Sequence, residues 1–178
     1  DEAGRVLPAG EIGTVYFERR DFSFEYHKDP VKTASARHPF RESWFTTGDL
    51  GYLDDDDVLF LTGRENFTII SGGVNIYPQE VESVLALHPL VHDVAVVGVP
   101  DADLGERVEA FVQLSPDVVD SDDPEREILE FCRERLSRFK CPRQVRVVDG
   151  LPRTPTGKMV KGELRDLIAR YGHSGVPS

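Results

Sequence analysis

A valine-rich run of nine residues, Val91–Val99, constrains the fold of this chain most strongly, because it is typical of a strand buried in a sheet. The next apolar run alternates, with Val108, Ala110, Val112 and Leu114 at every second position. A period of two predicts a strand that is buried on one face only. These two runs predict a sheet around which the rest of the domain must pack.

Helical segments separate these strands from two shorter ones. Short apolar runs at Phe67–Ile70 and Gln144–Val148 predict further strands. Apolar residues recur at helical spacing in three segments, Pro78–His88, Pro124–Leu136 and Lys161–Tyr171. The predicted order from residue 66 onward is β-α-β-β-α-β-α, an α+β domain in which helices pack on a sheet.

The N-terminal part has a different pattern and is predicted to be rich in β structure. Gly13–Glu18 is predicted as one short strand, and 29–41 as a loop or a short helix. Leu50–Leu53 and Val58–Thr62 flank the acidic run Asp54–Asp57, which predicts a hairpin. We therefore expect a β-rich segment at 1–65, an α+β domain at 66–172 and a tail at 173–178.

Charge and composition exclude several classes of function. With 21 basic and 32 acidic residues the net charge is −11, which argues against a nucleic-acid binder because phosphate affinity needs a positive field. Two cysteines are too few for a disulfide framework or a four-ligand zinc site. The histidines do not have the spacing of metal ligands, so no metal site is predicted. No apolar run approaches the roughly 18–20 residues of a membrane span. The segment from residue 135 to the C-terminus nevertheless has ten basic residues against three acidic ones, a local excess suited to a small anionic ligand.

Three motifs carry possible chemistry. The first is the turn that holds Asp49, and the second runs from Arg64 to Gly73. In Thr46-Thr47-Gly48-Asp49, a carboxylate on a turn between small residues is able to accept two hydrogen bonds from a ribose diol. Arg64 offers a fork of donors to phosphate or ribose oxygens, and the Ser71-Gly72-Gly73 turn lets a narrow ligand pass along the backbone. Each of these is an ordinary turn or surface charge when it is considered alone.

The third motif is Leu151-Pro152-Arg153-Thr154-Pro155-Thr156-Gly157-Lys158. Its prolines predict a rigid exposed loop from which Lys158 projects, and a projecting ammonium neutralises charge that develops on an oxyanion. It is not a phosphate-binding Walker A loop, because Met159 follows the lysine and no glycine stands at the required distance before it. A solvated lysine at the tip of a hairpin is the alternative for this motif in isolation.

The three motifs in this order and spacing resemble the C-terminal third of the adenylate-forming superfamily, over about residues 10–171. The stretch from Ile70 to Glu82 is most similar to fatty or medium-chain acyl-CoA synthetases. The resemblance implies the small C-terminal domain of that superfamily, preceded by the β-rich end of its large N-terminal domain. Because the chain starts with Asp1, in what reads as the middle of a domain, we expect it to be cut from a larger enzyme.

The resemblance also implies residue roles. Lys158 is then the catalytic residue of adenylation, Asp49 and Arg64 bind the nucleotide, and Asn66 is the hinge. Ser71, Gly72 and Gly73 line the path of pantetheine, and Phe139, Lys140 and Arg143 hold the nucleotide end of CoA. Asn66 departs from the Asp or Lys that is common at the hinge, and Cys141 stands where some aryl-CoA ligases have a basic residue.

The implied function is an AMP-forming carboxylic acid:CoA ligase that activates a fatty or other acyl carboxylate. ATP with Mg²⁺ and CoA are substrates, no tightly bound cofactor is expected, and the N-terminal domain is a partner in cis. The resemblance implies a cytoplasmic enzyme, with peripheral membrane association as a further option, and the chain alone is expected to be inactive. Two alternatives stay open: an adenylation domain that loads a carrier protein, and a non-catalytic binding module.

Overall fold

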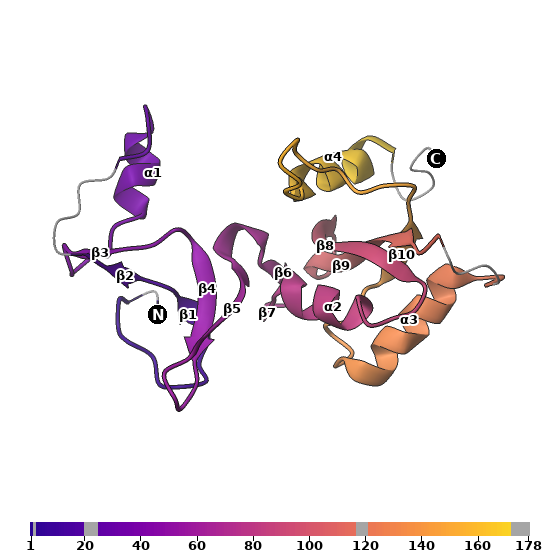
Figure 1. Ribbon diagram of the computed structural model, residues 1–178, viewed down its shortest axis with the longest axis horizontal. Coiled ribbons are helices and arrows are strands. Elements are labelled where there is room, and N and C mark those ends of the chain that lie inside the picture. The colour runs from indigo at the N-terminus through magenta and orange to yellow at the C-terminus, as the bar shows by residue number, and fades with distance from the viewer. Residues whose placement is uncertain (2, 20–24, 117–120, 172–178) are drawn as a thin grey trace. The chain divides into compact units, whose positions relative to one another are not determined.

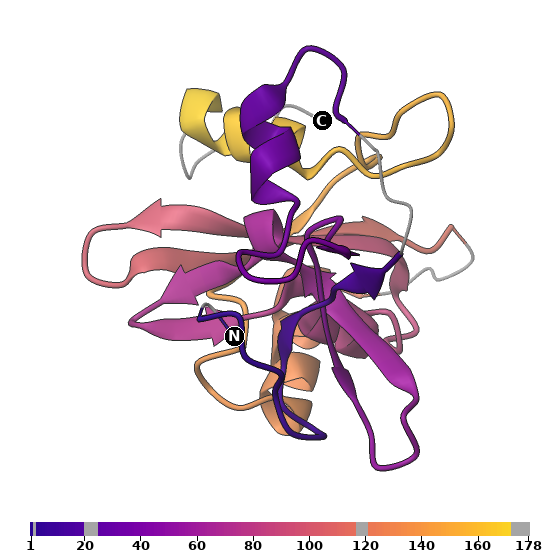
Figure 2. The same ribbon diagram turned by 90° about the vertical axis from the view of Figure 1, so that its left-hand side faces the viewer.

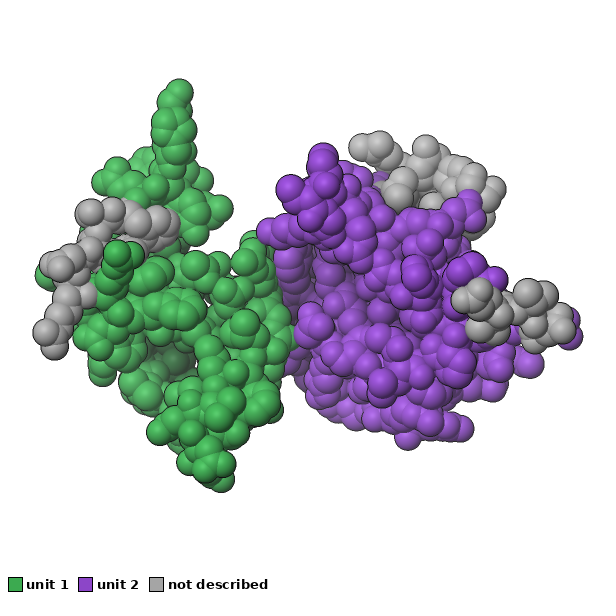
Figure 3. Space-filling model, viewed as in Figure 1, with its two compact units in different colours: residues 1–66 green, residues 67–178 purple. Residues whose placement is uncertain are grey.

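The computed structural model describes residues 1, 3–19, 25–116 and 121–171, so the predicted tail at 173–178 lies outside the described part. The chain divides into two compact units, Asp1–Asn66 and Phe67–Ser178 (Figure 3). The division falls directly after Asn66, the residue predicted as a hinge. No helix within the described ranges is long and apolar enough to cross a membrane.

The first unit is built from short strands and one helix. Strands β1 (Gly13–Thr14), β4 (Asp49–Leu53) and β5 (Leu59–Arg64) form one antiparallel sheet, and β2 (Phe17–Glu18) pairs with β3 (Trp44–Phe45). The predicted hairpin around the acidic turn is confirmed by the pairing of β4 with β5. Helix α1 (Pro30–Ser35) begins at Pro30 because the Asp29 carboxylate accepts a hydrogen bond from the Lys32 amide at 2.9 Å.

The prediction of one strand over Gly13–Glu18 is wrong. The Val15 amide still donates to the Asp49 carbonyl at 2.9 Å, beside β4. The Tyr16 ring then packs edge-on against His38, with ring centroids 4.8 Å apart. The chain therefore leaves the first sheet at Tyr16, and the next two residues pair with β3 instead.

The second unit has the predicted α+β architecture (Figure 1). Its sheet has the order β10-β9-β6-β7, and β8 also pairs with β9. The long β8–β9 hairpin is antiparallel (Figure 2), whereas β10 runs parallel to β9. The elements are β6 (Ile69–Ser71), β7 (Val74–Ile76), α2 (Pro78–Leu85), β8 (Val91–Asp101), β9 (Gly105–Leu114), α3 (Pro124–Arg135), β10 (Gln144–Val147) and α4 (Lys161–Tyr171).

Helices cover both faces of this sheet, with α2 and α3 on one face and α4 on the other (Figure 1). Val96, Val108, Ala110 and Val112 pack on the α2–α3 face with apolar residues of those helices such as Ile128. The alternating residues pack on the α4 face in a second core, which comprises Ala95, Val97, Val99, Phe111, Leu151, Leu164 and Ile168. The prediction of a half-buried strand at 108–114 is therefore wrong, because residues 108–112 are buried on both faces.

Strand β7 was not predicted. Its three residues follow Gly72 and Gly73, which both have positive φ and turn the chain back on β6. A run of three residues ending at Ile76 is too short for periodicity to reveal, and only Ile76 is buried. The two glycines are therefore the tip of a hairpin rather than a connection into the helix.

A buried carboxylate ties β9 to β10 on the α4 face. Glu109 is fully buried, and its oxygens bind Arg107 at 2.6 Å and Arg146 at 3.0 Å. Because charge-assisted hydrogen bonds from two sides compensate the burial of this carboxylate, the pair of strands is fixed in register.

His88, three residues after the end of α2, makes the stability of this unit depend on pH. It is buried, its Nδ1 accepts a hydrogen bond from the Leu90 amide at 3.2 Å, and its ring meets Phe131 edge-on at 4.8 Å. Burial lowers the pKa of His88 below its ordinary value, although nearby Glu127 opposes this effect. The unfolded chain therefore binds the proton more readily, and stability is lost as the pH falls below about 6.5.

We expect the free energy of unfolding, measured by urea titration of the chain, to fall between about pH 7 and pH 5. The side-chain oxygen of His88→Asn retains an acceptor for the Leu90 amide. In this variant the free energy of unfolding should fall less over the same pH range. Identical pH slopes in the two proteins would contradict the assignment.

Candidate functional site

Asp49 and Arg64 lie opposite each other on β4 and β5, at the end of the first unit's hairpin. Arg64 Nε donates to Asp49 Oδ1 at 3.0 Å, and the Thr47 hydroxyl donates to Oδ2 at 2.6 Å. The structure therefore brings the two predicted nucleotide-binding residues together as an ion pair. A ribose diol that binds Asp49 would share the carboxylate with these two donors.

Asn66 lies in the short 3-10 helix η1 (Glu65–Phe67), where the first unit ends. Together with Thr47 and Gly48 it lines a cavity of about 560 Å³ in the first unit. The Glu65 amide donates to the Gly48 carbonyl at 3.0 Å, so the Asp49 turn and the last residues of this unit are directly linked.

Lys158 lies at the end of a tight loop that the sequence predicted. The Thr154 amide donates to the Lys158 carbonyl and the Gly157 amide to the Thr154 carbonyl, each at 2.8 Å. Gly157 has a φ of 84°, a conformation that glycine adopts without steric cost. The Lys158 side chain is exposed, and within the described ranges its ammonium group forms no hydrogen bond or ion pair.

Two ion pairs attach this loop to the sheet and to α2. Arg153 binds Asp93 of β8 at 2.5 Å and also donates to the Gly157 carbonyl at 2.7 Å, directly before Lys158. Lys161, three residues later, binds Glu82 of α2 at 2.5 Å. The same Glu82 oxygen accepts from the Val96 amide of β8 at 2.7 Å. The backbone that presents Lys158 is therefore held from both sides, while the side chain itself extends freely.

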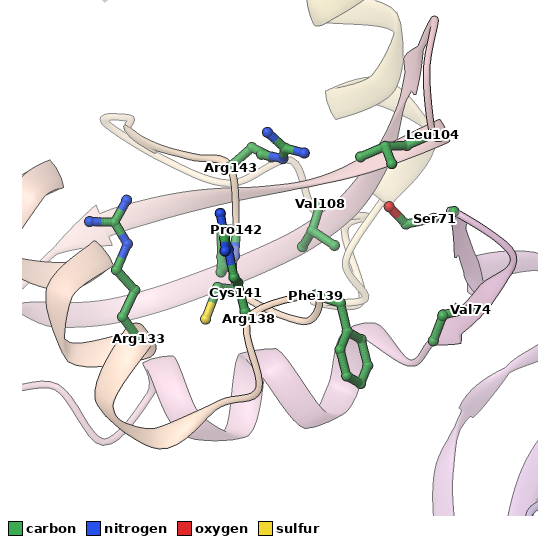
Figure 4. Close-up of a pocket in the computed structure, with 11 residues that line it drawn as sticks. Ser71, Val74, Leu104, Val108, Arg133, Arg138, Phe139, Cys141, Pro142 and Arg143 are labelled. Atoms are coloured by element: carbon green, nitrogen blue, oxygen red, sulfur yellow. The ribbon is translucent and has the colours of Figure 1, made fainter.

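A cavity of about 980 Å³ lies in the second unit, between the β6–β7 hairpin, β9 and the segment after α3 (Figure 4). Such a volume lies at the upper end of the usual range for sites that bind small molecules and cofactors. Its lining is apolar at β9 and positively charged toward α3 and the following segment. The lining residues are Ser71, Gly72, Val74, Leu104, Val108, Arg133, Arg138, Phe139, Cys141, Pro142 and Arg143.

The cavity collects most of the residues predicted to bind CoA, together with two that were missed. Ser71, Gly72, Phe139 and Arg143 line it. Gly73 and Lys140 are not among the lining residues, and the Lys140 ammonium instead binds both oxygens of Glu80 at 2.6 and 2.7 Å. The residues that the prediction missed are Arg133 and Arg138.

The basic excess after residue 135 is the sequence signal that could have indicated Arg138. Arg133 belongs to α3, and only the fold brings that helix beside the following segment. Among the described residues, no carboxylate forms an ion pair with Arg133, Arg138 or Arg143. Three arginines line this one hollow in a chain of net charge −11, so the hollow is a candidate anion-binding surface.

Cys141 lines the cavity as a neutral thiol. Its Sγ lies 3.6 Å from the carbonyl oxygens of Cys132 and Ser137, at the end of α3. Burial raises the pKa of Cys141 and raises that of Cys132 to about 12. Because the thiolate is the reactive form, neither cysteine is suited to act as a nucleophile here.

The loop that carries Lys158 and the cavity lie on opposite faces of the sheet. Met159, next to Lys158, packs on the core of the α4 face. Val108 and Cys141, which line the cavity, belong to the core of the α2–α3 face or pack against it. Two chemically distinct surfaces are thus carried by one rigid unit. No cluster of three or more potential metal ligands is found in the described part of the chain.

Comparisons with known proteins show which proteins this chain is similar to. Residues 80–158 match the family model of the AMP-binding enzyme C-terminal domain. The long-chain-fatty-acid–CoA ligase FadD13 of Mycobacterium tuberculosis is 42% identical over 163 residues, which are 92% of this chain and 31% of that enzyme. The fatty acid–[acyl-carrier-protein] ligase ScoC of Streptomyces coeruleorubidus is 39% identical over 93% of this chain and 31% of its own length.

Solved structures lead to the same family. The o-succinylbenzoate CoA synthetase of Bacillus subtilis, in complex with its acyl-adenylate intermediate, superimposes with a TM-score of 0.78. It is 35% identical, and the match covers 92% of this chain and 32% of that one. The chain thus spans about a third of the length of the relatives it matches. Residues 80–158 thus match an AMP-binding enzyme C-terminal domain, and nearly the whole chain is similar to about a third of the length of adenylate-forming ligases.

Proposed function

We propose that this chain is the C-terminal part of an ATP-dependent carboxylic acid:CoA ligase. The observation that carries the proposal is the placement of Lys158 and the arginine-lined cavity on opposite faces of one sheet. An exposed lysine suits a step that develops negative charge on phosphate oxygens. A hollow lined by arginines suits a polyanionic second substrate such as CoA. The relatives named as CoA ligases support both halves of the proposal.

In the first half-reaction a carboxylate oxygen attacks the α-phosphorus of ATP, which enters with its magnesium ion as substrate. The new bond joins that oxygen to phosphorus, and the phosphorus–oxygen bond to pyrophosphate breaks. Lys158 contacts the carboxylate and α-phosphate oxygens and offsets the charge that accumulates on them. Asp49 accepts from the ribose hydroxyls, and Arg64, held beside it at 3.0 Å, orients the carboxylate and contacts the ribose or phosphate.

In the second half-reaction the thiolate of CoA attacks the acyl carbon, and AMP leaves with the electrons of the broken carbon–oxygen bond. Pantetheine passes along Ser71, Gly72 and Gly73, at the tip of the β6–β7 hairpin. Phe139 has an exposed ring for stacking on the adenine base, and Arg143 binds phosphate. Lys140, which binds Glu80, supports the same segment from outside the cavity.

One unit with two working faces needs to turn between the two half-reactions. A rigid sheet cannot direct opposite faces at one acyl group at the same time. We place the pivot at Asn66, where the first unit ends and the second begins. A hinge needs backbone freedom more than a particular side chain, so Asn is compatible with this role.

A second candidate differs only in the acceptor, which would be the pantetheine of a carrier protein. The similarity to the carrier-protein ligase of Streptomyces coeruleorubidus supports it. The arginine-lined cavity favours CoA, because three guanidinium groups match the several phosphates of a free nucleotide. Thioester yield with free CoA against yield with a phosphopantetheinylated carrier protein distinguishes the two acceptors.

The experiment that tests the function is an assay of the complete ligase with ATP, CoA and a panel of carboxylates. We expect equimolar AMP, pyrophosphate and acyl-CoA, and no turnover by residues 1–178 alone, since two-thirds of the length of the relatives is outside this chain. ADP and phosphate as products would contradict the proposal, as would acyl-CoA formation by the 178-residue chain itself. Because the reaction consumes ATP and CoA, we propose the cytoplasm as the location of the enzyme.

A further inference from the structure

The β6–β7 hairpin is joined to the rest of its sheet by few backbone contacts. Ser71 is paired with Gly105 of β9, and the Gly72 amide donates to the Leu104 carbonyl at 2.8 Å. The Ile70 amide, two residues before that of Gly72, is bound by a side chain instead. Glu106 Oε2 accepts from it at 2.9 Å. One carboxylate therefore extends the attachment of the hairpin that carries Ser71-Gly72-Gly73.

Gly98 leaves the space in which this carboxylate sits. A Cβ at Gly98 would lie 2.9 Å from Cδ and from both carboxylate oxygens of Glu106, closer than a real Cβ approaches any atom. Gly98 lies within β8, paired with Val108, and its φ is not in the left-handed region. The backbone there accepts any residue, so a side chain at this position would mainly force the Glu106 carboxylate to move.

We propose that Glu106 is a positioning residue for thioester formation. This inference rests on the proposed function, because it gives Ser71-Gly72-Gly73 the role of a pantetheine path. A hydrogen bond from a backbone amide to a carboxylate is about twice as strong as one between neutral groups. Glu106 therefore holds the hairpin at the edge of the cavity, beside the lining residues Leu104 and Val108. Adenylation does not depend on this contact, since the Lys158 loop packs on the other face of the sheet.

The test uses the complete ligase and measures the two half-reactions separately. Pyrophosphate exchange reports adenylation, and conversion of supplied acyl-AMP to acyl-CoA reports thioester formation. In Glu106→Ala we expect thioester formation to fall roughly tenfold to hundredfold while adenylation is retained. Gly98→Ala should have the same effect, because the added methyl group displaces the carboxylate. Glu106→Gln, whose amide oxygen accepts from the Ile70 amide, should restore most of the rate.

Asp103→Asn is the matched control, because Asp103 is an exposed acid of the same β8–β9 turn, and both half-reactions should be unchanged. Hydrogen exchange of the Ile70 amide should accelerate in Glu106→Ala and stay slow in Glu106→Gln. Equal loss of both half-reactions in a folded Glu106→Ala protein would overturn the inference, and so would unchanged thioester formation. Failure of the proposed function itself would be seen differently, as a wild-type protein that forms no acyl-AMP or no CoA thioester.

Discussion

Replacing Lys158 with alanine is expected to lower the rate of acyl-adenylate formation about 10²–10³-fold and to leave thioester formation from supplied acyl-AMP intact. In the proposed function the ammonium group is needed only where charge accumulates on phosphate and carboxylate oxygens. The loop that presents it is fixed by its own hydrogen bonds and by Arg153 and Lys161, none of which involves the Lys158 side chain. The substitution should therefore remove a charge without disturbing the fold.

Pyrophosphate exchange and single-turnover thioester formation, measured in the complete ligase, check this prediction. Lys28→Ala is a suitable control, since Lys28 is an exposed lysine of the first unit. The rate of adenylation in Lys158→Arg should lie between those of the wild type and Lys158→Ala, because the charge is kept and the geometry of the donor is changed. Parallel loss of both half-reactions in Lys158→Ala would show that Lys158 does not act in adenylation alone.

The second large effect is expected at the arginine-lined cavity. Replacing Arg143 or Arg138 with alanine should raise the KM for CoA roughly tenfold to hundredfold, with little change in kcat at saturating CoA. Each guanidinium is one of three that line the cavity, and none of the three forms an ion pair with a carboxylate among the described residues. The CoA concentration dependence of thioester formation gives both constants. Adenylation, which precedes CoA binding, should be unaffected.

Arg126→Ala provides the matched control for these variants. Arg126 is an exposed arginine on α3 whose guanidinium faces Asp123 and Glu130, away from the cavity residues. An unchanged KM for CoA in both Arg143→Ala and Arg138→Ala would place the nucleotide of CoA elsewhere. A rise in KM for ATP instead of CoA would assign the cavity to the first substrate.

The sequence predicted the fold best where each element carries its own signal. The helix at Lys161 begins and ends as expected, and the long valine run is a buried strand. The failures have physical causes. Strand β9 alternates in sequence, yet it is buried on both sides because Glu109 is compensated by two arginines and α4 covers that face. Strand β7 is too short for any period to appear.

The candidate site was predictable only as separate motifs. Asp49 and Arg64 are 15 residues apart in sequence, and their ion pair depends on the register of β4 with β5. The cavity joins the β6–β7 hairpin to α3 and the segment after it, so Arg133 could not be assigned before the fold was known. Lys140 is adjacent to Phe139 in sequence, yet its ammonium is bound by Glu80 of α2. Local sequence cannot decide between such neighbours.

In the proposed function, the second unit serves the two half-reactions through the two faces of its sheet. The most direct test measures both half-reactions in Lys158→Ala and Glu106→Ala, prepared and assayed side by side. We expect reciprocal results: adenylation is lost and thioester formation retained in Lys158→Ala, and the reverse holds in Glu106→Ala. If both half-reactions decline together in each variant, the two faces of the sheet do not have separate roles.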